Sequence, residues 1–266
     1  MHDQVTVVVG IDAKTIEQLA VSCDTWRRNR PEMWSMPWVV FWDWTQLTRD
    51  DIESIRARLA VPNLRLVEWP NGGAPKSEYE SQREMMLSGH VWVPGEHVET
   101  PWHAKIDTDT LALGPSDWLQ EAWFAADPVK GPPVYCAPRW GYSKGFDVIG
   151  RLERWGDAAL FEFRRLNIPF DPTHLRVPHA RMCSWVSYYA TTFTRMLCVL
   201  LKETCGSGKL PVPSQDSTVW YAAERARMFY RIVNQKKLFW NNYPKLAKLK
   251  EVAAQVLAGR EAMVDA

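Results

Sequence analysis

The sequence predicts an α/β fold in which a mixed, mostly parallel sheet is flanked by helices and is followed by a more irregular C-terminal half. Two observations support this prediction. Short β-branched or aromatic runs alternate three times with segments of helical spacing, as in βαβ units. The alternation then breaks near residue 113. No linker or internal repeat interrupts the 266 residues, so we expect one domain, 1–266, whose halves are 1–113 and 114–266.

The first half is expected to contain four strands and three helices in alternation. Its first strand is a run of β-branched residues, and Pro31 ends the helix that follows. Thr48 has the character of a helix N-cap, because Asp50 and Asp51 follow it in the first turn. The expected strands are 5–9, 38–44, 63–69 and 102–113, and the expected helices are 13–30, 48–60 and 77–92.

The second half has a less regular pattern. Its most apolar segment predicts a buried helix that a short strand could precede, and its last segment predicts an amphipathic helix. Ser214 is a candidate N-cap for the helix before that one. In order, we expect a helix and loop at 114–133, a strand at 134–143, a mixed segment at 146–174, the buried helix at 184–206, a loop and helix at 207–235, and the amphipathic helix at 243–261.

Composition excludes several classes of protein. The net charge is +1, which argues against a nucleic-acid partner. Five cysteines without a CxxC pair favour a reducing compartment, and no apolar run approaches the roughly 20 residues of a membrane span. We therefore expect a soluble, cytoplasmic protein. The basic residues of the C-terminal segment are compatible with contact to an anionic membrane, although a docked helix with a solvated basic face is the favoured interpretation; these residues are Lys236, Lys237, Lys245, Lys248 and Lys250.

Fifteen tryptophans are several times the usual number for a chain of this length. Core packing is the favoured interpretation for most of them. The alternative is that some form flat platforms on which sugar rings or nucleobases stack.

Two aspartates, Asp107 and Asp109, stand in the apolar segment "WHAKIDTDTLAL". In an extended backbone their side chains point to the same face. Two carboxylates this close repel each other unless a positive partner lies between them, and a divalent cation such as Mg²⁺ or Mn²⁺ prefers such oxygen ligands. Lys105 is the other available partner, but we expect it to compete poorly for both charges. The non-functional alternative is that the pair caps a turn.

The segment "AKIDTDTLAL", preceded by three βα units, resembles the DxD region of nucleotide-sugar-dependent glycosyltransferases of the GT-A fold. The resemblance covers about residues 5–113 and extends more weakly to about 230. It implies that 1–113 binds the nucleotide sugar and that 114–266 forms the acceptor side. It also implies that Asp107 and Asp109 hold Mn²⁺ or Mg²⁺ and that Asp107 contacts the donor.

The same resemblance assigns nucleoside-binding roles at the ends of the first two strands. By position these are Gly10 and Asp12 in "VGID" and Asp43 in "FWDW". A helix ahead of the DxD often carries an arginine that faces the nucleotide, and Arg83 in "SQREMM" stands at that place.

A later acidic residue at a helix start acts as the base in inverting members of the family, and the resemblance makes Asp216 the candidate. A carboxylate within reach of the acceptor hydroxyl assists its attack by taking the proton. The alternative is that Asp216 is only a helix cap. The expected activity is transfer of a sugar from a nucleoside-diphosphate sugar to the hydroxyl of a glycan or other acceptor, with inversion if Asp216 acts directly.

Two other functions remain open at the level of sequence. "IDTDTL" also resembles the DxDxT motif of haloacid dehalogenase-type phosphatases, but that motif normally follows the first strand and here it follows the fourth. The second alternative is a non-catalytic protein that resembles a glycosyltransferase and binds a nucleotide sugar or glycan without turnover. The glycosyltransferase interpretation would fail if the two carboxylates were turned apart, or were buried against lysine with no cleft beside them.

Overall fold

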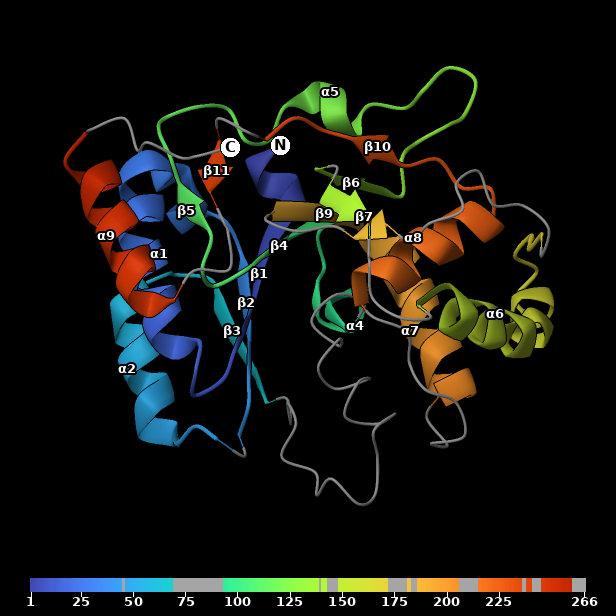
Figure 1. Cartoon of the computed structure of the whole chain (residues 1–266), viewed down its shortest axis with the longest axis horizontal. Helices are drawn as coiled ribbons and strands as arrows, with labels where there is room; N and C mark the ends of the chain where they lie inside the picture. Colours follow the sequence, from blue (N-terminus) through green and yellow to red (C-terminus); the bar gives the residue numbers. More distant parts are fainter. Residues whose placement is uncertain are drawn as a thin grey trace.

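The computed structural model describes residues 1–44, 46–68, 93–138, 140–142, 148–171, 181–182, 186–205, 215–235, 238–240 and 245–259. Within these ranges a seven-stranded sheet lies in the middle of the molecule and helices pack on both of its faces (Figure 1). The order across the sheet is β10 (Arg231–Ile232), β6 (Tyr135–Ala137), β9 (Val186–Ala190), β4 (Trp102–Ile106), β1 (Val5–Ile11), β2 (Trp38–Trp42) and β3 (Leu64–Glu68).

Of the seven strands, β9 alone runs against its neighbours. The pairs β1·β2, β2·β3, β1·β4 and β6·β10 are parallel, so the sheet is mixed and mostly parallel as expected. Two smaller ladders lie outside it: β5 (Leu111–Ala112) pairs with β11 (Phe239–Trp240), and β7 (Trp140–Tyr142) pairs with β8 (Arg181–Met182).

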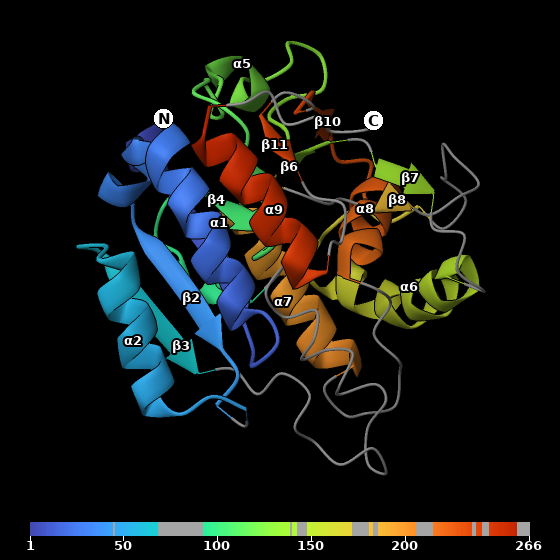
Figure 2. The ribbon, with the colours of Figure 1, turned by 60° about the vertical axis from the view of Figure 1, so that its left-hand side comes forward.

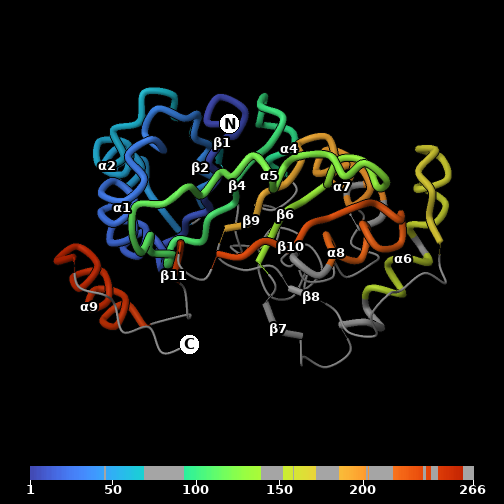
Figure 3. The backbone as a smooth tube through the Cα atoms, turned by 90° about the horizontal axis from the view of Figure 1, so that it is seen from above, coloured from blue at the N-terminus to red at the C-terminus, as the bar shows by residue number. Residues whose placement is uncertain are grey.

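The helices form two groups, one on each face of the sheet (Figures 1 and 3). The first group is α1 (Ile16–Asn29) and α2 (Arg49–Leu59), with α9 (Leu246–Leu257) lying along α1 (Figure 2). The second is α4 (Pro94–His97), α6 (Val148–Arg165), α7 (Thr191–Cys205) and α8 (Gln215–Arg225). Shorter elements are α5 (Glu121–Phe124) and the 3₁₀ helices η1 (His2–Gln4) and η2 (Pro31–Ser35).

Strand β1 shows why both faces must be covered. Val7 and Val9 pack into the core that includes α1 and α2, whereas Val8 packs into the core of α6, α7 and α8. Successive side chains of a strand point to opposite faces, so a continuous apolar run needs a helix layer on each side.

The expected elements of residues 5–69 are confirmed. The structure places β1, α1, β2, α2 and β3 within three residues of the expected bounds. The hydroxyl of Thr48 accepts a hydrogen bond from Asp51 N, and the Asp51 carboxylate accepts one from Thr48 N, which is a capping box. The expected helix 77–92 lies outside the described residues.

The prediction of one strand at 102–113 is wrong. Strand β4 ends at Ile106, and Thr110 N donates to Asp107 O at 3.0 Å to close a turn before β5. Apolar residues flank the turn on both sides, so the sequence pattern of 102–113 predicted one continuous strand. Asp and Thr side chains, however, offer the backbone local hydrogen bonds that favour a turn.

Other expectations of the second half are mixed. The strand expected at 134–143 is two strands, β6 and β7, in different sheets, and the helix of 114–133 is only the four residues of α5. The buried helix expected at 184–206 is α7 preceded by β9, and the C-terminal amphipathic helix is α9. Helices at 148–165 and 215–225 lie inside the expected mixed segment and the expected loop-helix segment.

Core packing accounts for most of the tryptophans that the structure describes. Trp44 is the exception, with 54% of its surface exposed directly after β2. The buried ones are Trp26, Trp38, Trp42, Trp102, Trp118, Trp123, Trp155, Trp220 and Trp240. Among the described residues, no helix combines the length and the apolar character that crossing a bilayer requires.

Candidate functional site

The first part of the candidate site lies where β1 and β4 end side by side. The two strands are parallel, and the last paired residues are Val8 and Lys105. Gly10 and Asp107 each lie two residues beyond this last pair, near the carboxyl ends of the two strands.

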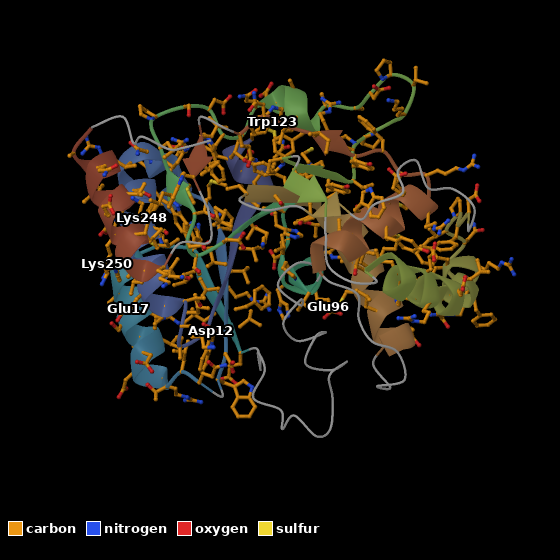
Figure 4. The ribbon with its side chains drawn as sticks, in the orientation of Figure 1. Asp12, Glu17, Glu96, Trp123, Lys248 and Lys250 are labelled. Atoms are coloured by element: carbon orange, nitrogen blue, oxygen red, sulfur yellow. The ribbon has the colours of Figure 1, made fainter. Side chains whose placement is uncertain are left out.

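The end of β2 lies on the other side of β1. Asp43 N donates to Ile11 O at 3.0 Å, so Asp43 follows the last residue pair of the two strands. Asp12 lies at the lower end of β1 in the view of Figure 4. Gly10, Asp12, Asp43 and Asp107 therefore all lie at or just beyond the carboxyl ends of parallel strands, the end at which ligands bind in open α/β sheets.

Asp12 uses one carboxylate oxygen to start α1. Its Oδ1 accepts hydrogen bonds from Lys14 N, Thr15 N and Thr15 Oγ1, each at 2.9 Å. These contacts stabilise the turn at residues 12–15, which leads into α1 and its N-cap Thr15. The assignment of Asp12 to the nucleoside stays a prediction.

Asp43 is fully buried, and its Oδ2 accepts a hydrogen bond from Gln46 Nε2 at 2.6 Å. The half-exposed indole of Trp44 follows it directly. The end of β2 therefore presents an aromatic face to solvent and keeps its acid inside. A nucleoside contact by Asp43 also stays a prediction.

The turn after β4 exposes its two acids and buries its two threonines. Asp107 and Asp109 are half-buried, whereas Thr108 and Thr110 are buried. Burial therefore still alternates from residue to residue in the turn, as it does along a strand. The two carboxylates lie on the more exposed side, although the backbone is no longer extended. Asp107 has 25% of its side chain exposed.

Side chains of α1 hold this turn in place. Ser22 Oγ donates to Thr108 O at 2.6 Å, and Trp26 Nε1 donates to Thr110 O at 2.6 Å. Asn29 Nδ2 reaches Ala112 O at 2.7 Å. Residues 22, 26 and 29 lie on one face of a helix, so a single helix face fixes the backbone of 108–112. Sequence reasoning missed this contact, although polar residues at helical spacing on an otherwise buried face were its signal.

Lys105 contacts the acid pair, contrary to expectation. Its Nζ lies 2.5 Å from Asp107 Oδ1, and its side chain is 3% exposed. Strand periodicity is the reason, because residues 105 and 107 point to the same face of β4. The expectation that Lys105 competes poorly is wrong for Asp107. The carboxylate is nevertheless partly open to solvent, so it is not buried against the lysine.

The donor set of the turn fits a hard divalent cation with two protein ligands. Two outward carboxylates supply the oxygen atoms that Mg²⁺ and Mn²⁺ prefer, and such ions keep coordination positions for water or phosphate. Within the described ranges no three His, Cys, Asp or Glu side chains come close enough to hold a metal ion.

Two predicted site residues cannot be placed by their side chains. Arg83 lies outside the described residues. Asp216 is the second residue of α8, which confirms that a helix begins there, but its side chain also lies outside the description. The role of each stays a prediction.

The thiols of Cys23 and Cys136 do not act as nucleophiles near neutral pH. Burial raises the pKa of the Cys23 thiol to about 12 and that of the Cys136 thiol to about 12. Since the thiolate is the nucleophile, these two side chains are inert near neutral pH.

A cavity of about 570 Å³ lies at the opposite end of the strands. Residues near the N-terminus and α5 line it, among them His2, Asp117 and Glu121. It lies near the amino end of β1, which begins at Val5, and is separate from the candidate site.

Comparison with solved structures identifies the fold. Core-mannan synthase A (CmsA/Ktr4) from Aspergillus fumigatus, in its Mn/GDP form, matches with a TM-score of 0.58 and 9% identity over 91% of this chain and 75% of that one. The mannosyltransferase Ktr4p from S. cerevisiae matches with a TM-score of 0.58 and 9% identity over 99% of this chain and 82% of that one. No protein-family model matches the sequence, and no curated protein matches it by sequence.

These matches show that the chain has the GT-A type of fold, as the sequence predicts. At this level of identity they show the fold alone, and fold by itself does not fix activity. The turn that carries Asp107 and Asp109 follows β4, the fourth strand along the chain. In haloacid dehalogenase-type phosphatases the corresponding motif follows the first strand.

Proposed function

We propose that the protein is a metal-dependent glycosyltransferase that moves a sugar from a nucleoside-diphosphate sugar to an acceptor hydroxyl. The observation that carries this proposal is the turn after β4. It leaves the side chains of Asp107 and Asp109 partly exposed just beyond the carboxyl end of β4, the end of the parallel strands at which ligands bind in open α/β sheets. The Mn/GDP form of the fungal synthase that shares this fold supports the same chemistry.

In this proposal each part of the site has a separate task. Asp107 and Asp109 would hold the divalent ion, which when bound supplies positive charge to a departing diphosphate. Gly10 leaves room for the diphosphate to approach the strand ends. Trp44 offers an exposed indole on which a flat nucleobase can stack.

The acceptor side depends on Asp216. Its position in the first turn of α8 is supported by the fold, and a carboxylate there would take the proton of the acceptor hydroxyl as that oxygen attacks the anomeric carbon. Direct attack by the acceptor would invert the anomeric configuration. Asp12, Asp43 and Arg83 complete the proposed nucleoside side.

The test is release of nucleoside diphosphate from a panel of sugar nucleotides, measured with Mn²⁺ and again with excess chelator. A transferase without acceptor should hydrolyse one donor slowly, and chelator should stop the release. A phosphatase would instead release phosphate from simple esters. A non-catalytic binding protein would release neither nucleoside diphosphate nor phosphate. Phosphate release from simple esters, or no release at all, would contradict the proposal.

A further inference from the structure

The feature that carries a further inference is the buried lysine beneath the acid pair. Lys105 Nζ lies 2.5 Å from Asp107 Oδ1, and the lysine side chain is 3% exposed while that of Asp107 is 25% exposed. Lysine is almost never fully buried unless it is paired. One of the two charges in the DxD turn therefore already has a partner that belongs to the protein.

Strand pairing on both sides fixes the backbone of Lys105. Strand β4 lies between β1 and β9, and Lys105 is paired with Val8 on one side and with Ser187 on the other. Paired residues of neighbouring strands point to the same face at close range. The side chains of Lys105 and Ser187 therefore leave the sheet on the same face, the face on which the ammonium contacts Asp107.

Ser187 is a polar residue paired with Lys105 across the two strands. The serine is fully buried, and its Oγ has no hydrogen-bond partner among the described residues. Because a hydroxyl oxygen can accept a hydrogen bond, movement of the ammonium toward Ser187 would replace part of its contact with Asp107.

We infer that Lys105 is a positioning residue that opposes metal binding at Asp107 until a diphosphate is present. The inference rests on the proposed function of the acid pair. The ammonium neutralises one carboxylate charge and repels a divalent ion bound nearby. A nucleoside diphosphate brings negative charge that offsets this repulsion, so metal and nucleotide bind the wild-type protein synergistically.

The test is a calorimetric titration of Mn²⁺ into the wild-type protein and Lys105→Met, with and without UDP or GDP as probes. Methionine keeps the length of the buried stem and removes the charge. The variant should bind Mn²⁺ alone about tenfold more tightly than wild type, from removal of one nearby positive charge. The enhancement of Mn²⁺ binding by nucleotide should shrink by a similar factor, because the variant lacks the repulsion that the diphosphate offsets in the wild-type protein.

Lys248→Met is the matched control. Lys248 Nζ lies 2.9 Å from Glu251 Oε1 on the exposed side of α9, so this variant also breaks a lysine–carboxylate pair. Its Mn²⁺ affinity should equal that of wild type. If Lys105→Met binds Mn²⁺ no more tightly than wild type does, the inference is overturned.

Two further measurements cover a variant that fails to fold. Lys105→Gln removes the charge with a side chain that can still donate to Asp107, and the same tenfold gain is expected. In the wild-type protein, the ¹⁵Nζ resonance of Lys105 should shift when Mg²⁺ and nucleotide are added together, and an unchanged resonance counts against the inference. A wild-type protein that binds neither metal nor nucleotide overturns both the proposed function and the role of Lys105, whereas normal binding without a gain in the Lys105 variants overturns the role of Lys105 alone.

Discussion

The acids at the ends of β1 and β2 differ from those after β4 in what their oxygen atoms contact. Asp12 gives its Oδ1 to three donors at the start of α1, and Asp43 is buried against Gln46. Asp107 and Asp109 stand on a turn whose backbone is held by α1, and Asp107 Oδ1 lies 2.5 Å from Lys105 Nζ. Acids at the strand ends thus differ in their partners: Asp12 accepts hydrogen bonds from neutral groups, whereas Asp107 is paired with a buried positive charge.

Replacing both acids of the turn should have the largest effect on activity. We expect Asp107→Asn with Asp109→Asn to lower the rate of donor hydrolysis by about 10²–10³, as when a charge-stabilising group is lost. The free energy of unfolding should also fall, because Asp107→Asn removes the carboxylate charge that lies 2.5 Å from the buried Lys105 ammonium. Urea denaturation and the donor assay measure the two effects.

Asp127→Asn is the control for that pair. Asp127 also lies in a turn, and its Oδ1 accepts hydrogen bonds from Val129 N and Lys130 N. Its substitution should leave the rate unchanged. A rate that falls equally in both proteins would mean that the acid pair has no special role.

The side-chain hydrogen bonds from α1 to the backbone of 108–112 act as a clamp on the turn. Breaking this clamp should have a smaller effect, which lowers both the stability of the fold and the binding of ligands. Trp26→Phe removes the donor to the buried Thr110 carbonyl, and we expect a loss of about 1–3 kcal/mol in the free energy of unfolding. Because the turn carries Asp107 and Asp109, stabilisation by Mn²⁺ and nucleotide should also weaken. Urea denaturation and thermal unfolding with ligands provide the measurements.

Trp34→Phe separates the two consequences. Trp34 Nε1 donates to Leu59 O at 2.6 Å, away from the turn. This variant should lose stability but keep the full response to ligands. Equal loss of the ligand response in Trp26→Phe and Trp34→Phe would show that the clamp does not organise the site.

Replacing Asp12 should have a smaller effect again. Asp12→Ala removes the hydrogen bonds of the partly exposed turn before α1 and should lower the free energy of unfolding by about 1 kcal/mol, whereas Asp12→Asn, which keeps an oxygen acceptor, should change it by only about a few tenths. Denaturation in urea at neutral pH distinguishes them. An Asn variant as unstable as the Ala variant would mean that the charge of Asp12, rather than its hydrogen bonds, stabilises the start of α1.

The capping box of α2 supplies a pH test of the same structural role. Hydrogen bonds from the hydroxyl and the backbone N–H of Thr48 lower the pKa of Asp51 from 3.8. A carboxylate with a lowered pKa contributes stability above the unfolded value, and this contribution is lost as the pH falls through the folded pKa. In Asp51→Asn, stability should therefore fall less steeply below about pH 4. A slope identical to that of wild type would show that the capping box does not contribute.

Sequence periodicity predicted the first half of the fold well because its elements carry local signals. A β-branched run defines β1, and Thr48 with Asp51 marks the start of α2. The turn at 107–110 was missed because apolar residues flank it on both sides, and hydropathy alone does not separate two short strands from one long strand.

The candidate site was predictable in its acids and not in their surroundings. The spacing of Asp107 and Asp109 and their position after a parallel strand are visible in the sequence. The contact from Lys105 depends on which face of β4 is covered, and the clamp by Ser22 and Trp26 depends on how α1 packs. Both are tertiary features, for which residue spacing gives no register between distant segments.

The most direct test of the central claim is thermal unfolding of the wild-type protein with a panel of nucleoside diphosphates, each with and without Mn²⁺. The account predicts that one nucleotide together with Mn²⁺ raises the midpoint by roughly 5–10 °C at about 100 times the dissociation constant, and that either ligand alone does far less. An unchanged midpoint with every nucleotide, in the presence of Mn²⁺, would contradict a metal–diphosphate site at Asp107 and Asp109.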